Sequence, residues 1–366
     1  MTNTKVITIP QLFCMLFISR MVVNITYNPL MSQSNTMWDH VVSAAVTFLL
    51  TFLLFLPLYF LHKRRPELNI VDYAYFRMGR LACVIAVVYL LYFLIVSCYT
   101  LSLFDLFVGN VMSPQTSLFA LSLAVLVTAC YGAFKGLEAL SRTSGIILIG
   151  VLASIVFLVC ALIPQTDPSN YTPLFYDGME KTVNGVLLMI SRTSGIAVLA
   201  MLLPFARGNV KKGFIVWNTA VFAVIVIMIT LIVGALGEYL ETQIFPIYAA
   251  TSIAEIGMLK RLDALYLGVW TTGLFVKLAL LLYLMSLCVQ RVLGRKAGRI
   301  SILVCAGIVL ILSLLTTESR AFAYVVYDMR LLLYGTLVVS VLIPLIFLIV
   351  DLVKGKGEPR VEKKEN

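Results

Sequence analysis

Ten apolar stretches follow one another along this chain, and each is about as long as the 20-residue helix that crosses the hydrocarbon core of a bilayer. They cover roughly residues 8–31, 41–61, 82–108, 117–136, 143–163, 184–206, 213–236, 264–289, 299–316 and 331–353. The sequence therefore predicts an all-α polytopic membrane protein with ten transmembrane helices. Residues 1–353 are expected to form a single transmembrane domain, and the charged residues 354–366 a disordered cytoplasmic tail.

Composition and charge placement agree with this class. The chain has 61% hydrophobic and 13% charged residues and a mean hydropathy of +0.99, which excludes a soluble domain of this size. The net charge of +10 does not indicate nucleic-acid binding, because the Lys and Arg residues gather in loops on one side of the predicted spans. The positive-inside rule then places both termini in the cytoplasm.

The sequence contains no pattern typical of an enzyme or a metal site. The seven cysteines lie in or beside apolar stretches without the spacing of metal ligands, and the two histidines lie at span ends. No nucleophile stands near a matching base. We therefore expect no catalytic activity, no metal and no cofactor.

Two arginines lie in the middle of apolar spans. Arg20 belongs to the segment 18–26 of span 1, Arg192 belongs to span 6, and each follows a serine. A guanidinium keeps its charge at any physiological pH, so each needs a partner or a water-filled cavity. Polar interruptions at matching places in two halves indicate a transporter-type ligand site. The alternative is that each arginine pairs with a carboxylate and only locks helices together.

The matching interruptions also predict an internal repeat. Spans 1–5 cover about 8–163 and spans 6–10 about 184–353, and each half begins with an interrupted span. Because five is an odd number, the second half must enter the membrane from the opposite side. The result is a 5+5 inverted repeat with broken spans 1 and 6.

Short motifs along almost the whole chain carry a family resemblance. They include Ile9-Pro10-Gln11-Leu12-Phe13, Pro66-Glu67-Leu68-Asn69-Ile70, Tyr131-Gly132-Ala133-Phe134-Lys135-Gly136-Leu137-Glu138, Asn170-Tyr171-Thr172-Pro173-Leu174-Phe175, Lys260-Arg261-Leu262-Asp263-Ala264-Leu265 and Phe275-Val276-Lys277. In their order and spacing the chain resembles the B subunit of GerA-type endospore germinant receptors. These subunits form the spore germination permease family of the amino acid–polyamine–organocation superfamily.

The resemblance implies a LeuT-like fold and a function. A protein of this family is expected to sense a nutrient, typically an amino acid, as an integral protein of the spore inner membrane. It is expected to work with receptor A and C subunits. The Ser-Arg pairs in both broken spans depart from the family, where small neutral residues are expected, and this leaves the identity of the ligand open.

We expect the ligand to lie between the two broken spans, because half-helix N-termini favour a carboxylate and free backbone groups can hold an ammonium. The candidate residues are Ser19, Arg20, Val23, Asn24 and Thr26 of span 1 and Ser191, Arg192, Thr193, Ser194 and Gly195 of span 6. Arg20 or Arg192 would hold the carboxylate through paired hydrogen bonds. Tyr92 and Tyr99 of span 3 would close the pocket; the alternative for each is an ordinary buried tyrosine with a satisfied hydroxyl.

Lys277 is a third charge inside a span. It lies about 20 Å along span 8 at 1.5 Å per residue. In LeuT-like folds the ion site joins spans 1 and 8, so the resemblance implies that the Lys277 ammonium substitutes for a sodium ion. The alternative is that the side chain reaches toward the cytoplasmic surface.

Two functions remain open from the sequence. One is a receptor subunit that binds a nutrient and signals to its partners. The other is a proton-coupled amino-acid permease, with Lys277 as the proton-binding group.

Overall fold

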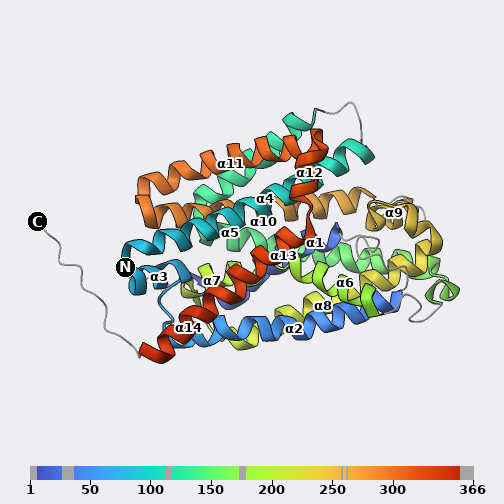
Figure 1. Ribbon diagram of the computed structural model, residues 1–366. Coiled ribbons are helices and arrows are strands. Elements are labelled where there is room, and N and C mark those ends of the chain that lie inside the picture. The colour runs from blue at the N-terminus through green and yellow to red at the C-terminus, as the bar shows by residue number, and fades with distance from the viewer. Residues whose placement is uncertain are drawn as a thin grey trace, which may run out of the picture.

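The computed structural model describes residues 6–26, 37–112, 117–172, 179–256, 259–260 and 263–354. Its helices are α1 (Ile9–Ile25), α2 (Met37–Arg64), α3 (Ile70–Met78), α4 (Cys83–Phe107), α5 (Leu118–Leu162), α6 (Met179–Ser191), α7 (Gly195–Leu202), α8 (Val210–Leu236), α9 (Pro246–Ile253), α10 (Asp263–Leu293), α11 (Arg295–Glu318), α12 (Arg320–Val326), α13 (Met329–Leu337) and α14 (Ile343–Lys354). Short 3-10 segments cover Gly79–Ala82, Ile163–Gln165, Pro168–Tyr171, Leu203–Phe205 and Gly237–Thr242, and π-helical turns cover Val108–Met112 and Val338–Leu342. The long helices run side by side in one bundle (Figure 1).

The helices confirm the polytopic all-α fold. Eight helical stretches of the described residues are long and apolar enough to cross a membrane, and α1 is a shorter apolar helix. One of the eight, Leu118–Gln165, contains two predicted spans, because α5 bends sharply at Gly136. The φ angle of Gly136 is +84°, which an L side chain rarely adopts, and so this glycine permits the bend.

Span 6 is interrupted where the sequence places the break. Helix α6 ends at Ser191 and α7 begins at Gly195, with Arg192, Thr193 and Ser194 between them. The same break separates the two green segments near the middle of the bundle in Figure 1.

Span 1 differs from the expectation in one respect. Helix α1 continues without interruption through Ser19 and Arg20 and ends at Ile25. The polar pair is therefore part of a regular helix, and the end of α1 lies about one and a half turns further on. The outer part of predicted span 1, from residue 27, lies outside the described residues, as do residues 355–366 of the predicted tail.

The core forms around α10 and α1. Helix α10 packs against α4, α5, α11 and α1. Trp270 of α10 is fully buried and contacts the rings of Phe104, Phe107 and Tyr266. Most residues of α1, and most of residues 273–288 of α10, are buried.

One end of the bundle, here called the basic end, holds Arg64, Arg77 and Arg291 with the start of α1 and the end of α14 (Figure 1). The buried carboxylate of Asp351 in α14 forms ion pairs with Arg64 of α2, at 3.2 Å, and with Arg77 of α3. It also accepts a hydrogen bond from the Tyr73 hydroxyl at 2.8 Å. These contacts join α14 to both α2 and α3.

Two short β-pairs complete the fold. Strand β1 (Ile7–Thr8) pairs in parallel with β2 (Ala206–Arg207), and the Val6 N–H donates to the Phe205 oxygen at 2.9 Å. The start of α1 is therefore joined to the end of span 6. Strands β3 (Glu255–Ile256) and β4 (Leu259–Lys260) pair antiparallel after α9.

Gly213 lets α8 pack closely on α1, and we expect a side chain there to be destabilising. A Cβ at this position would overlap the side chain of Ile9 and lie 2.6 Å from the Phe13 ring. Gly213→Ala should lower the free energy of unfolding by about 1–3 kcal/mol, as overpacking does in a filled core. Thermal unfolding of the detergent-solubilised protein measures this effect.

Gly307→Ala is the matched control, because nothing lies within 4 Å of a Cβ at Gly307 in α11. Alanine also favours a helix over glycine. An equal loss of stability in both variants would contradict the close packing of α1 on α8.

Candidate functional site

Arg20 joins the middle of α1 to the end of α6. Its Nη1 donates a hydrogen bond to the backbone oxygen of Arg192 at 2.8 Å, and its Nη2 donates to the backbone oxygen of Met189 at 3.4 Å. The residue is only 8% exposed. Carbonyl groups at a helix C-terminus carry partial negative charge, so a guanidinium is favourable there. Among the described residues, Arg20 therefore bonds backbone carbonyls and not the carboxylate of the alternative prediction.

The other carbonyls at the end of α6 also have donors. The Leu188 oxygen accepts from the Ser191 hydroxyl at 2.8 Å, the Met189 oxygen from the Thr193 hydroxyl at 2.8 Å, the Ile190 oxygen from the Thr193 N–H at 2.9 Å, and the Ser191 oxygen from the Thr336 hydroxyl at 3.1 Å. Each of the five carbonyls from residue 188 to residue 192 thus accepts at least one hydrogen bond. The carbonyl groups that the break in span 6 exposes therefore have hydrogen-bond partners.

Tyr92 supports this break from span 3. Its hydroxyl lies 3.1 Å from the Thr336 hydroxyl of α13, which in turn donates to the Ser191 oxygen. Tyr92 is a buried tyrosine with a bonded hydroxyl, which was the alternative considered for it. Its contact with the broken span runs through Thr336.

Tyr99 lies directly against the second arginine. The Arg192 guanidinium carbon is 5.6 Å from the centre of the Tyr99 ring, within the range of a cation–π interaction. The ring of Tyr327 packs edge-on against Tyr99 at 5.9 Å between centroids. Arg192 is thus directed toward α4, whereas Arg20 is directed toward α6.

Lys277 lies in the interior of the bundle. It is 2% exposed, which argues against a side chain that reaches the aqueous surface. Four residues earlier in α10, Gly273 brings the helix so close to α1 that a Cβ there would lie 2.7 Å from Val22. The charges of Arg20 and Arg192 both act on Lys277. Arg20 and Arg192 are therefore close enough to influence Lys277 electrostatically.

A cavity adjoins the two arginines on the side away from α2. It has a volume of about 30 Å³ and is lined by Arg20, Val23, Asn24, Met189, Arg192, Ile225, Met228, Ile229, Ile232 and Ile247. This volume exceeds what a single water molecule requires. Four predicted ligand-binding residues, Arg20, Val23, Asn24 and Arg192, are brought together here.

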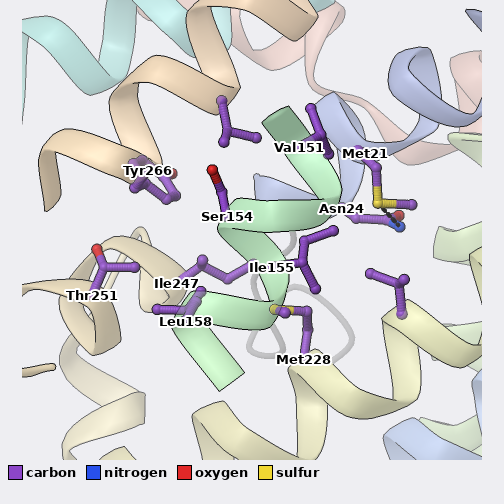
Figure 2. A pocket seen from close by; sticks show the side chains of 12 residues that line it. Met21, Asn24, Val151, Ser154, Ile155, Leu158, Met228, Ile247, Thr251 and Tyr266 are labelled. Atoms are coloured by element: carbon purple, nitrogen blue, oxygen red, sulfur yellow. Dashed lines mark hydrogen bonds between the residues drawn. The ribbon is translucent and has the colours of Figure 1, made fainter. Parts of the chain in front are cut away.

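A larger, apolar cavity of about 60 Å³ lies beside the first. Its lining includes Met21, Ile155, Leu158 and Tyr266 (Figure 2). Asn24, Met228 and Ile247 line both cavities. Helix α9 provides Ile247 and Thr251 to the lining of this cavity.

The remaining predicted residues surround these cavities without lining them. Thr193 and Arg20 line a third cavity of about 20 Å³ between α2 and α8. Ser19 and Thr26 are buried in or at the end of α1, and Ser191 and Ser194 flank the break. Gly195 allows Trp217 to approach, because a Cβ there would lie 2.9 Å from the indole.

The sequence analysis did not single out Asp105, a carboxylate inside span 3. It is 1% exposed and accepts hydrogen bonds from Ser122 of α5 and from Ser313 of α11, the latter at 2.5 Å. These contacts tie three helices together. A lone acidic residue within an apolar span was the signal that could have identified it.

Comparisons with known proteins agree with this architecture. A substrate-bound, outward-open Na⁺-coupled sialic acid symporter superposes with a TM-score of 0.66 over 98% of this chain and 92% of that one, at 10% sequence identity. The likeness shows that this chain has the LeuT-like fold.

Sequence comparisons identify the family. Spore germination protein XB of Bacillus anthracis is 24% identical over 208 residues, which are 54% of this chain and 58% of that protein. The model of the spore germination protein family matches residues 6–321. The chain therefore belongs to the spore germination protein family, whose members include integral membrane proteins of this helical type.

Proposed function

We propose that this protein is the nutrient-sensing subunit of a spore germinant receptor. It binds a small carboxylate-bearing nutrient, with the amino acids as the expected class, between spans 1 and 6. Arg20 and Arg192, which line the same cavity, carry this proposal. Among the described residues that line the two neighbouring cavities, none is Asp or Glu, so a bound anion is favoured electrostatically.

The two arginines have different roles in this proposal. Both terminal nitrogens of Arg20 donate to backbone carbonyls of residues 189 and 192. Arg192 lines the same cavity, and we propose that it holds the carboxylate. The Arg192 guanidinium also lies within cation–π range of the Tyr99 ring, which favours its present position. Tyr99 in this way closes the pocket through Arg192.

The signal would travel through the break in span 6. Thr336 links the Ser191 carbonyl to α13, and α14 below it holds Asp351 in ion pairs with α2 and α3. A ligand that changes the geometry of residues 191–194 therefore acts on span 10 and on the basic end. We propose that this end faces the cytoplasm of the spore core, with both termini there, and that receptor A and C subunits respond to it in the spore inner membrane.

The second candidate function is a proton-coupled amino-acid permease. Its support is the fold likeness to a Na⁺-coupled symporter. Uptake of a labelled nutrient by proteoliposomes that contain only this chain distinguishes the two: a receptor subunit binds without accumulation, whereas a permease concentrates the solute when a proton gradient is imposed.

Arg192→Ala should weaken the nutrient response while the protein remains folded in the membrane. Loss of a charge-assisted pair of hydrogen bonds corresponds to roughly 1.5–3 kcal/mol, so the half-maximal nutrient concentration should rise about tenfold to a hundredfold. Germination of spores, followed by their loss of optical density, measures this response.

Arg142→Ala is the matched control. Residues 141–146 have the same sequence as residues 191–196, but Arg142 is exposed and pairs with Glu138 at 2.6 Å. This variant should respond as the wild type does. A normal response of Arg192→Ala would show that the arginine is structural and that the proposed site is wrong.

We propose that the Lys277 ammonium takes the place of a coupled sodium ion between spans 1 and 8. The buried position of Lys277 and the close packing of α10 on α1 at Gly273 support this role. Nutrient binding by the wild-type protein should then be the same in sodium chloride and in N-methylglucamine chloride, as measured by equilibrium binding. Binding that requires sodium would rule out the substitution.

A further inference from the structure

We infer that the ligand is an organic monocarboxylate without an amino group, because the Arg20 guanidinium takes the place of a ligand ammonium at the end of α6. This inference deepens the proposed function and rests on its placement of the ligand between spans 1 and 6. Within the carboxylate-bearing nutrients, it replaces the amino acids as the expected class by compounds such as 2-oxo acids that carry a small apolar group.

The carbonyl groups at the break in span 6 bear on whether the ligand carries an ammonium. In a site of this type, the ammonium of an amino acid would need the carbonyl groups that a helix end leaves free. Here the carbonyls of residues 188–192 all accept hydrogen bonds from within the protein, and the Arg192 oxygen accepts from Arg20 itself at 2.8 Å. Arg20 is a cation fixed to the chain at the place where a ligand cation would bind.

The charges around the cavity oppose the binding of an ammonium. An ammonium in the cavity of Arg20 and Arg192 would lie beside two guanidinium groups and near Lys277. None of the described residues that line this cavity is acidic. Repulsion between like charges is strong in a buried site, because little solvent screens it. A ligand that carries only negative charge avoids this repulsion.

The N-terminus of α7 is a second source of positive potential near Arg192. Helix α7 begins at Gly195, and its N-cap residue Ser194 makes no side-chain hydrogen bond to the first turn. The partial positive charge of this helix end is therefore not compensated by the cap. It lies three residues from Arg192, so the guanidinium and the helix end favour the same ligand charge.

The larger cavity favours a ligand with an apolar group. The 60 Å³ cavity shares Asn24, Met228 and Ile247 with the cavity of the arginines and is therefore its direct neighbour, where we place the apolar part of the ligand. Its lining is mostly aliphatic, with Met21, Ile155 and Leu158 among the side chains drawn in Figure 2. Such a surface favours a branched hydrocarbon group over a polar one.

The test compares matched pairs of ligands that differ only at the second carbon. The pairs are 4-methyl-2-oxopentanoate with L-leucine, 3-methyl-2-oxobutanoate with L-valine, and phenylpyruvate with L-phenylalanine. Equilibrium binding is measured by isothermal titration calorimetry on the full-length protein in lipid nanodiscs. We expect at least one 2-oxo acid to bind, and to bind about tenfold or more tightly than its amino-acid partner.

The outcomes separate this inference from the proposed function. Amino acids that bind more tightly than 2-oxo acids, with loss of binding in Arg192→Ala, overturn the inference but support the proposed site. If no compound of either series binds, both the inference and the proposed site are rejected.

Arg20→Ala provides a second, independent readout. Removal of the guanidinium opens the Arg192 carbonyl and removes one positive charge, so an ammonium becomes easier to accommodate. We expect the ratio of 2-oxo acid affinity to amino-acid affinity to fall about tenfold. Arg142→Ala should leave the ratio unchanged, and size-exclusion chromatography checks that each variant is folded. An unchanged ratio in a folded Arg20→Ala protein overturns the inference.

Discussion

The contact between the Arg20 guanidinium and the carbonyl groups at the end of α6 is the interaction on which the centre of this structure depends. A helix that ends inside a membrane leaves carbonyl groups without partners, and each would cost several kcal/mol in hydrocarbon. A guanidinium inside a membrane helix is also costly, because its N–H groups and its positive charge need acceptors. The hydrogen bonds between the guanidinium and the carbonyl groups satisfy both, and they join α1 in the first half of the chain to the interrupted span 6 in the second half.

This contact also accounts for the form of α1. Since Arg20 finds its partners across the interface, α1 has no local need to unwind at Ser19 and Arg20, and its helical hydrogen bonds continue to Ile25. The irregular backbone is instead concentrated in span 6, where hydroxyl groups of Ser191, Thr193 and Thr336 complete the set of donors. The polarity of residues 191–194 thus serves the backbone first and a ligand second.

Much of the fold was predictable because membrane insertion imposes simple rules on sequence. Apolar length located the ten spans, and Gly136, at the predicted end of span 4, is where α5 bends. The break after Ser191 was predictable from a polar segment within an apolar span. These features depend on local sequence, because the thickness of the bilayer sets the length of each apolar helix.

The partners of the buried charges were not predictable. The Arg20 acceptors lie 172 and 169 residues away and are backbone atoms, which no residue pattern encodes. Tyr92 was expected to close the pocket, yet its hydroxyl bonds Thr336, because the choice among nearby hydroxyl groups is made by tertiary packing. Asp105 forms its network with serines of two other helices, and only their assembly places Ser122 and Ser313 against it.

The pairing of β1 with β2 has a mechanical consequence. Two strands of two residues join the beginning of the chain to the end of span 6, and Gly213 holds α8 against the same segment of α1. A displacement of α7 about residues 192–194 would therefore also move β1 and Val6, which are hydrogen-bonded to the segment that follows α7. Such a movement reaches the start of the described chain without unfolding a helix.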